Sequence, residues 1–314
     1  MDRKPVSVKS YANIAIVKYW GKADAERMIP STSSISLTLE NMYTETKLSF
    51  LPEDATGDVM YIDDELQGEK ETTKASKVLD LFRTNPNQHV KIETWNNMPT
   101  AAGLSSSSSG LSALVKAANE LFQVGKTQSE LAQIAKFASG SSSRSFFGPL
   151  AAWDKDSGEV YQVETDLKLA MIMLVLTDKK KPVSSRDGMK LCTETSTSFP
   201  EWIKQSEQDY KDMLVYLKAN DFQAVGELTE ANALRMHQTT STANPPFSYL
   251  TDASYQAMDK VKALRASGEQ CYFTMDAGPN VKVLCLEEDL DRLADHFRKD
   301  YQVIVSRTKE LPDA

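Results

Sequence analysis

NNMPTAAGLSSSSSG, residues 96–110, is the stretch of this chain that indicates its fold. The residues before it, HVKIETW at 89–95, alternate in polarity and predict a strand. After it, apolar side chains recur at helical spacing from Leu111 to Phe122 and predict a helix. Small residues let the backbone approach a ligand, and a helix N-terminus offers unpaired N–H groups and the positive end of a dipole. The segment is therefore typical of a phosphate-binding loop.

The composition of residues 96–110 alone would favour a flexible serine-rich linker. The strand before it and the helix after it favour an ordered ligand-binding loop instead. Gly125-Lys126-Thr127 matches the end of a Walker A loop, but Glu120 stands where the upstream glycine is required, and the triplet follows the helix. There is no G-x-G-x-x-G of a dinucleotide fold. A bound nucleotide would therefore be held by a loop of a different kind from either of these two motifs.

Composition narrows the function classes. The chain has 314 residues and a formal net charge of -8, which argues against nucleic acid as the main partner. It has no apolar run long enough for a bilayer and no signal-peptide core behind its first residues, so no membrane association is expected. Its odd number of widely spaced cysteines favours reduced thiols and hence a cytoplasmic location. Its three cysteines form no C-x-x-C, and its three histidines, His237 among them, show no metal-ligand spacing. A zinc site or a Ser-His-Asp triad has little support.

The pattern along the chain predicts an α+β protein of two lobes with a cleft between them. Strands are expected at 6–20, 43–50, 160–163, 169–176, 270–276 and 301–305. Helices are expected at 69–84, 128–138, 201–219, 222–237, 249–267 and 290–298. The polar, basic segment 178–186 is predicted to join the halves, giving an N-terminal lobe over 1–182 and a C-terminal lobe over 183–314.

Four further segments carry groups suited to an anionic ligand. They are NIAIVKYWGK at 13–22, SGSSSR at 139–144, Ser184-Ser185-Arg186, and DAGPN at 276–280. Each also has a plain structural interpretation: solvated lysines, a helix cap with a surface arginine, a loop, and a turn aspartate. Together they supply hydroxyls, two arginines, two lysines and one aspartate, which fit ATP plus a small polyanionic substrate.

These motifs, with NMPTAAGLSSSSSG at 97–110, give the chain a resemblance to the diphosphomevalonate decarboxylase family of the GHMP kinase superfamily. They occur in family order and the resemblance spans nearly the whole chain. The first and last motifs separate this family from its kinase relatives. The resemblance implies a two-lobed GHMP kinase fold, with an N-terminal lobe like domain 2 of ribosomal protein S5 and a ferredoxin-like C-terminal lobe.

The resemblance also implies a reaction and its residues. ATP and mevalonate 5-diphosphate would give isopentenyl diphosphate, ADP, phosphate and CO2, with Mg2+ as cofactor, in the mevalonate pathway of isoprenoid biosynthesis. Asp276 would orient or deprotonate the C3 hydroxyl, and Lys18 would stabilise phosphate charge. The substrate carboxylate would be bound by Arg144 with help from Asn13. The diphosphate would be held by Tyr19, Lys22, Ser139, Ser141, Ser185 and Arg186.

The nucleotide side of the site follows from the same resemblance. The loop around the ATP phosphates would use Asn96, Pro99, Ala101, Ala102, Gly103, Leu104, Ser105, Ser106, Ser107 and Ser108, with Ser106 or Ser107 on Mg2+. The segment Lys180–Arg186 is expected to close over the substrates. A homodimer is expected.

Three alternatives stay open at this stage. A GHMP small-molecule kinase would share the loop and stop at phosphorylation. A sensor on the same fold would bind both ligands without making ADP. A phosphomevalonate decarboxylase would use the 5-monophosphate in place of the diphosphate.

Overall fold

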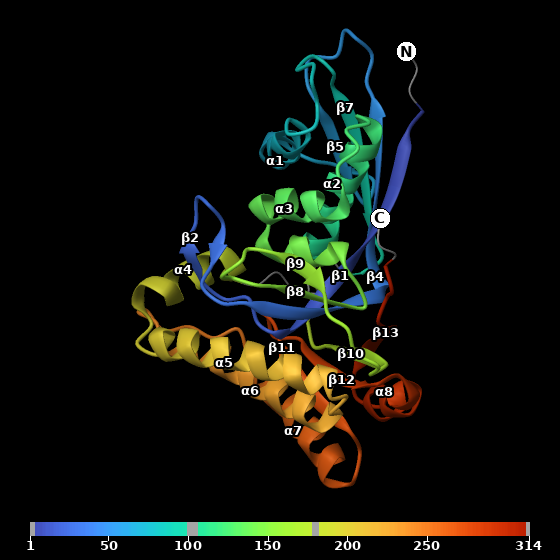
Figure 1. Ribbon diagram of the computed structural model, residues 1–314. Coiled ribbons are helices and arrows are strands. Elements are labelled where there is room, and N and C mark those ends of the chain that lie inside the picture. Colours follow the sequence, from blue (N-terminus) through green and yellow to red (C-terminus); the bar gives the residue numbers. More distant parts are fainter. Residues whose placement is uncertain (1–3, 99–105, 178–181, 312–314) are drawn as a thin grey trace.

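The computed structural model describes residues 4–98, 106–177 and 182–311. Its strands form two large sheets, one in each half of the chain, and a small hairpin of β2 (Lys22–Asp24) and β3 (Ile29–Pro30). Figure 1 shows the two sheets in separate lobes, each with its own helices. The predicted α+β class and two-lobed arrangement are confirmed.

The N-terminal sheet is built around one long strand, β4 (Ser34–Phe50). β1 (Val6–Val17) pairs antiparallel with β4 from Val6 opposite Leu48 to Val17 opposite Ile35. The rest of the sheet runs in the order β6-β5-β7-β4-β8-β9. Its other strands are β5 (Val59–Ile62), β6 (Glu65–Leu66), β7 (Val90–Asn96), β8 (Leu150–Trp153) and β9 (Val160–Gln162).

Helices of the N-terminal lobe bury a core against this sheet. They are α1 (Glu69–Leu79), α2 (Ser106–Leu121), α3 (Gln128–Ala138) and the 3-10 helix η1 (Gly140–Phe146). α3 begins where predicted because Thr127 and Glu130 form a capping box. α1 ends at Leu79, earlier than the predicted 84. The strand β7 and the helix α2 flank the serine-rich segment as predicted.

The C-terminal sheet has the order β11-β12-β10-β13, and each neighbouring pair is antiparallel. Its strands are β10 (Leu169–Val175), β11 (Cys271–Met275), β12 (Val281–Leu286) and β13 (Gln302–Arg307). With helices between β10 and β11 and between β12 and β13, this is the βαββαβ pattern of a ferredoxin-like lobe. β10 precedes residue 183 yet lies inside this sheet, so a division at 182 separates it from the strands that it pairs with.

The helices of the C-terminal lobe are α4 (Ser185–Thr195), α5 (Phe199–Lys218), α6 (Phe222–Ser241), α7 (Asp252–Ala266) and α8 (Leu290–Arg298), with the short 3-10 helix η2 (Glu287–Asp289). The prediction of a loop at Ser185 and Arg186 is wrong. Both residues lie in the first turn of α4, because the hydroxyl of Ser184 accepts a bond from the N–H of Asp187 and caps a helix there. Within the described ranges, none of the helices combines the length and apolar character needed to cross a membrane.

β1 connects the two lobes. Ile14 and Ile16 of β1 share one buried core with Met171 and Met173 of β10 and with Leu284 of β12. The opposite face of the C-terminal sheet is buried against α7 and α8. Because β1 ends at Val17, the residues that follow it lie at the junction between the lobes.

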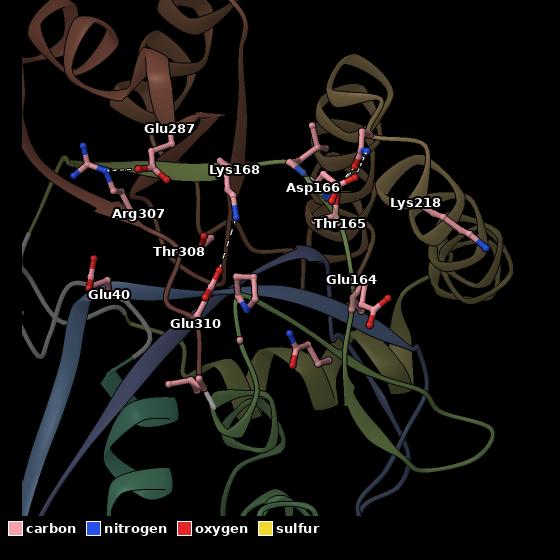
Figure 2. A pocket seen from close by; sticks show the side chains of 17 residues that line it. Glu40, Glu164, Thr165, Asp166, Lys168, Lys218, Glu287, Arg307, Thr308 and Glu310 are labelled. Atoms are coloured by element: carbon pink, nitrogen blue, oxygen red, sulfur yellow. Dashed lines mark hydrogen bonds and ion pairs between the residues drawn. The ribbon is translucent and has the colours of Figure 1, made fainter. Parts of the chain in front are cut away.

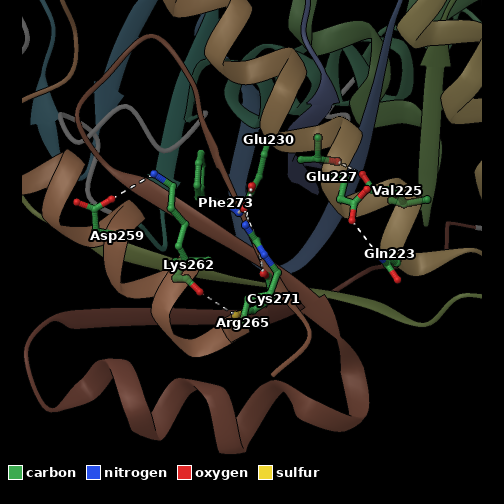
Figure 3. Close-up of polar contacts among 11 residues, drawn as sticks. Gln223, Val225, Glu227, Glu230, Asp259, Lys262, Arg265, Cys271 and Phe273 are labelled. Carbon is green, nitrogen blue, oxygen red and sulfur yellow. Dashed lines mark hydrogen bonds and ion pairs between the residues drawn. The ribbon is translucent and has the colours of Figure 1, made fainter. Parts of the chain in front are cut away.

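A polar network fixes β11 to two helices (Figure 3). Arg265 of α7 donates to both carboxylate oxygens of Glu230 of α6, at 2.6 and 3.1 Å. The N–H of Phe273 in β11 donates to Glu230 at 3.0 Å, and Arg265 also donates to the carbonyl of Cys271 at 2.9 Å. The network therefore holds the strand that leads to Asp276.

Glu230→Ala is expected to lower the free energy of unfolding by about 2–3 kcal/mol, because it leaves Arg265 without its counter-ion and the N–H of Phe273 without its acceptor. Urea denaturation measures the change. Glu227→Ala is the control, since Glu227 lies one turn earlier on α6 and contacts Gln223 in an exposed pair. Its effect should stay below about 0.5 kcal/mol. Equal losses in the two variants would contradict a structural role for the Glu230 network.

Candidate active site

Asn13 lies where three of the sequence motifs meet. Its side-chain amide donates to the carbonyl of Ser141 at 2.9 Å and to the hydroxyl of Ser145 at 2.8 Å. Its backbone N–H makes a long contact of 3.5 Å to the hydroxyl of Ser108 in α2. The motif of β1, the 139–144 turn and the helix after the serine-rich loop are therefore brought together, as predicted.

Arg144 is a buried cation whose side chain, among the described residues, donates to neutral groups. Its Nε and Nη1 donate to the hydroxyls of Ser36 and Ser34 at 3.0 and 2.7 Å, and Nη2 lies 3.4 Å from Oδ1 of Asn13. Within the described ranges it forms no ion pair with a carboxylate. Burial lowers its pKa to about 10, so it is still charged at neutral pH. A buried cation of this kind is suited to an anionic ligand.

Asp276 follows β11 and meets one lysine from each lobe. Nζ of Lys18 lies 2.8 Å from Oδ1, and Nζ of Lys282 in β12 lies 3.0 Å from Oδ2. The two lysine side chains are 2% and 1% exposed, whereas that of Asp276 is 23% exposed. Asp276 is therefore the member of this group that is open to a ligand.

The charges around Asp276 and Lys18 shift the pKa values of these two residues. Burial raises the pKa of Asp276, but the Lys18 and Lys282 ammonium groups outweigh it and hold that pKa well below its usual range. Burial lowers the pKa of Lys18 to about 8, with Asp276 opposing the change and Lys282 and Arg144 adding to it. At neutral pH the cluster is a carboxylate between two cations.

Hydrogen bonds fix both the backbone and the side-chain ammonium group of Lys18. Its backbone N–H donates to Oδ1 of Asn232 in α6 at 2.8 Å, and its Nζ donates to the carbonyl of Ala15 at 2.7 Å. Asn232 in turn donates to Asp209 of α5, which also pairs with Arg235. These contacts fix the position of the ammonium group beside Asp276.

Lys22 and Arg186 form a second positive region near Tyr19, whose hydroxyl is influenced by the charges of both Arg144 and Arg186. Burial and the charge of Arg186 lower the pKa of Lys22, so two cations that repel each other share this region. Burial raises the pKa of Tyr19 to about 12, so its hydroxyl stays protonated. A Cβ on Gly140 would lie 2.8 Å from the ring of Tyr19, so the close approach of the two requires glycine there.

The remaining predicted groups lie at the start of η1 and of α4. The hydroxyls of Ser139 and Ser141 lie 3.2 Å apart at the start of η1. Ser185 and Arg186 occupy the N-terminal turn of α4, where backbone N–H groups favour an anion.

The serine-rich segment is described only from Ser106, the first residue of α2. Ser107 is exposed in the first turn, and Ser108 is buried with its hydroxyl toward Asn13. Asn96 ends β7, and its Oδ1 accepts a bond from the hydroxyl of Thr44 at 2.7 Å. The other predicted loop residues lie outside the described ranges: Pro99, Ala101, Ala102, Gly103, Leu104 and Ser105.

Two family models cover most of the chain. The diphosphomevalonate decarboxylase-like N-terminal domain matches residues 10–163, and the mevalonate 5-diphosphate decarboxylase C-terminal domain matches residues 171–312. The chain belongs to the diphosphomevalonate decarboxylase family. Its fold is the GHMP kinase-type fold of that family, as the resemblance implies.

Individual relatives match over nearly their full length. The solved mevalonate pyrophosphate decarboxylase of Streptococcus pyogenes is 67% identical, with a TM-score of 0.97 over 100% of this chain and 99% of that chain. A structure described as MDDEF in complex with MVAPP, AMPPCP and magnesium is 40% identical, with a TM-score of 0.90 over 98% of both chains. The diphosphomevalonate decarboxylase of Candida albicans is 30% identical over 94% of this chain and 88% of its own length.

Away from the Asp276 cluster, the surface has a hollow of about 1080 Å³. Figure 2 shows the charged side chains around it. It is lined by Pro149 and residues 162–168 on one side, and by Arg307 and Thr308 near β13 on the other. Lys168 and Glu310 face each other across it at 3.8 Å. Among the described residues, none of those predicted for the site lines this hollow, so it is separate from the Asp276 cluster.

Two residues of the cluster were outside the sequence-based prediction. Lys282 stands in the apolar run VKVLCL, and a lysine in such a strand usually points to solvent. His237, which the sequence did not connect with the site, is buried near Asp276. Burial lowers its pKa to about 4, so it is neutral at neutral pH. Asn280 of the DAGPN motif accepts bonds from the N–H groups of Leu176 and Thr177 and so fixes the end of β10.

Proposed function

We infer that this chain catalyses the ATP-dependent decarboxylation of mevalonate 5-diphosphate to isopentenyl diphosphate, with ADP, phosphate and CO2 as co-products. Its family membership supports this activity, and so does the relative whose structure is described as a complex with MVAPP, AMPPCP and magnesium. The observation that carries the inference in this chain is the open carboxylate of Asp276, held by two buried lysines and with Arg144 contributing to its surroundings.

The chemistry needs ATP because a tertiary hydroxide is a poor leaving group. The C3 oxygen first takes the γ-phosphoryl group, ADP is released, and the proton of the C3 hydroxyl passes to solvent. The C3–O bond then breaks and phosphate leaves with the bonding pair. The bond between the carboxylate carbon and C2 breaks, CO2 departs, and that electron pair forms the C2=C3 double bond. The electrons flow toward the departing phosphate, so the reaction needs no separate electron sink.

We propose the following contacts for the substrate. The carboxylate lies against the buried guanidinium of Arg144, with Asn13 beside it. The diphosphate lies in the second positive region, bound by Tyr19, Lys22, Ser139, Ser141, Ser185 and Arg186. The mutual repulsion of Lys22 and Arg186 supports this assignment, because a shared anion would relieve it.

We propose that Asp276 orients the C3 hydroxyl by accepting its hydrogen bond. The low pKa of Asp276 makes it a weak proton acceptor in this state, and this favours orientation over full deprotonation. Lys18 stabilises the negative charge of the phosphoryl group as it approaches the oxygen.

The hydroxyl groups at the start of α2 fit Mg2+, which prefers oxygen ligands and is commonly shared with substrate phosphates. Within the described residues, no cluster of three or more His, Cys, Asp or Glu side chains could hold a metal ion. We propose that Ser106 or Ser107 contacts the ion and that the loop before them wraps the ATP phosphates. When bound, Mg2+ neutralises phosphate charge.

The pKa of Lys18 predicts a pH dependence. Lys18 is a cation below about pH 8 and loses its charge above it. We expect kcat/KM, which reports the free enzyme, to fall about tenfold per pH unit above this point. Lys18→Arg keeps the charge, so its fall should lie at higher pH. A wild-type profile that is flat to about pH 10 would remove the Lys18 ammonium from the reaction.

Turnover on the two phosphorylation states of the substrate separates this function from its nearest rival. We expect a large preference for mevalonate 5-diphosphate over the 5-monophosphate, and the preference should shrink in Lys22→Met, which loses a proposed diphosphate contact. A preference for the monophosphate would make the chain a phosphomevalonate decarboxylase. We further propose that the enzyme is a cytoplasmic homodimer, which light scattering on the purified chain tests for the oligomeric state.

A further inference from the structure

We propose that Lys282 is a positioning residue of this enzyme, which holds the second oxygen of Asp276 and so keeps the carboxylate aimed at the substrate hydroxyl. The proposal rests on the proposed function for the identity of that hydroxyl. Its geometric basis is the placement of Nζ of Lys282 3.0 Å from Oδ2 of Asp276, while Lys18 holds Oδ1 at 2.8 Å. With one ammonium on each oxygen, the carboxylate has little freedom to rotate.

The position of Lys282 in the sheet is costly for a lysine. It lies in β12 between Val281 and Val283, opposite Met173 of β10 and Thr274 of β11. Its side chain is 1% exposed, and within the described residues its Nζ has no hydrogen-bond partner apart from the ionic contact with Asp276. An apolar side chain of similar length would serve the packing of this sheet at least as well. A buried lysine aimed at one carboxylate therefore indicates a role in the site.

The other charged and titratable groups around Asp276 come from three further elements. Lys18 follows β1, Arg144 lies in η1, and His237 of α6 is neutral at neutral pH because of burial. Lys282 helps to lower the pKa of both Asp276 and Lys18. Removing its charge should therefore raise both pKa values, so the pH profile should move upward.

The test compares Lys282→Met with Lys282→Arg, which keeps the charge, and with Lys262→Met, which removes a lysine from an exposed pair with Asp259 on α7. We expect Lys282→Met to lower kcat on the order of 10- to 100-fold with little change in KM for either substrate. The fall in its kcat/KM at high pH should begin at a higher pH than in the wild type. In Lys282→Arg the fall in kcat/KM should begin at the same pH as in the wild type. Lys262→Met should match the wild type in kcat, KM and pH profile.

The pH at which kcat/KM begins to fall distinguishes a positioning role from a purely structural one, because the loss of a packing contact does not shift it. A wild-type kcat in Lys282→Met would overturn the proposal. A lower kcat would also overturn it if kcat/KM still began to fall at the wild-type pH. If Lys282→Met lacks a cooperative unfolding transition, Lys282→Gln is judged by the same two criteria. CO2 release by the wild-type enzyme tests the proposed function separately. If the wild type released no CO2 from mevalonate 5-diphosphate, the proposed reaction would be refuted before any variant is compared.

Discussion

Asp276→Asn is expected to lower kcat by about 10²–10⁴-fold or more while KM and ligand affinity stay nearly unchanged. The substitution keeps the shape of the side chain and removes only the charge that accepts the hydrogen bond of the C3 hydroxyl. The neighbouring Lys18 and Lys282 stay in place, so the positive surroundings that attract the substrate remain. Steady-state kinetics and calorimetric titration of mevalonate 5-diphosphate measure the two effects.

The fold of Asp276→Asn also needs a check, because the change leaves two buried ammonium groups without their counter-ion. A cooperative unfolding transition and near wild-type affinity show that the site is formed. Turnover close to that of the wild type would then remove Asp276 from the chemistry. Lost affinity together with lost turnover would make it a binding group instead.

Arg144→Met is expected to lower kcat/KM by about 10²–10⁴-fold, because losing a buried charged contact with the substrate costs about 3–5 kcal/mol. We expect the free energy of unfolding to stay constant or to rise, because the variant removes a buried cation that no described carboxylate pairs with. Activity and stability should therefore change in different directions. Kinetics with mevalonate 5-diphosphate and urea denaturation test the pair of effects.

Arg83→Met is the matched control for Arg144→Met. Arg83 is also buried, but it pairs with the buried carboxylate of Asp58 at 2.6 Å and lies in the turn after α1. Its removal should cost about 3–5 kcal/mol of stability because Asp58 loses its counter-ion. We expect little change in kcat/KM for the fraction that is folded. If Arg144→Met lost as much stability as Arg83→Met, Arg144 would be a structural cation and not a waiting partner for substrate.

The sequence predicted the parts of the fold that have strong local signals. α3 and α8 were predicted with their observed bounds, and β7 and α2 flank the serine-rich segment as expected. The motif residues Asn13, Lys18, Arg144 and Asp276 come together because Asn13 lies in β1 and Lys18 directly follows it at the junction of the lobes.

Other features depend on contacts that no local pattern contains. The polar start of α4 resembles a connecting loop, and only the Ser184 and Asp187 spacing of an N-cap indicates a helix. β12 follows a tight turn directly after Asp276, so its Lys282 was not connected with the site. Asn232 reaches the backbone of Lys18 from α6, 214 positions along the chain, and such a pairing exists only in the folded protein.

The stoichiometry of CO2 and ADP formed from mevalonate 5-diphosphate and ATP tests the central claim most directly. Trapped CO2 and coupled ADP detection on the same reaction measure both products. The proposed function predicts one CO2 for each ADP, with isopentenyl diphosphate as the organic product. ADP without CO2 would make the chain a small-molecule kinase, and binding of both substrates without ADP would make it a sensor; either result would contradict the decarboxylase function.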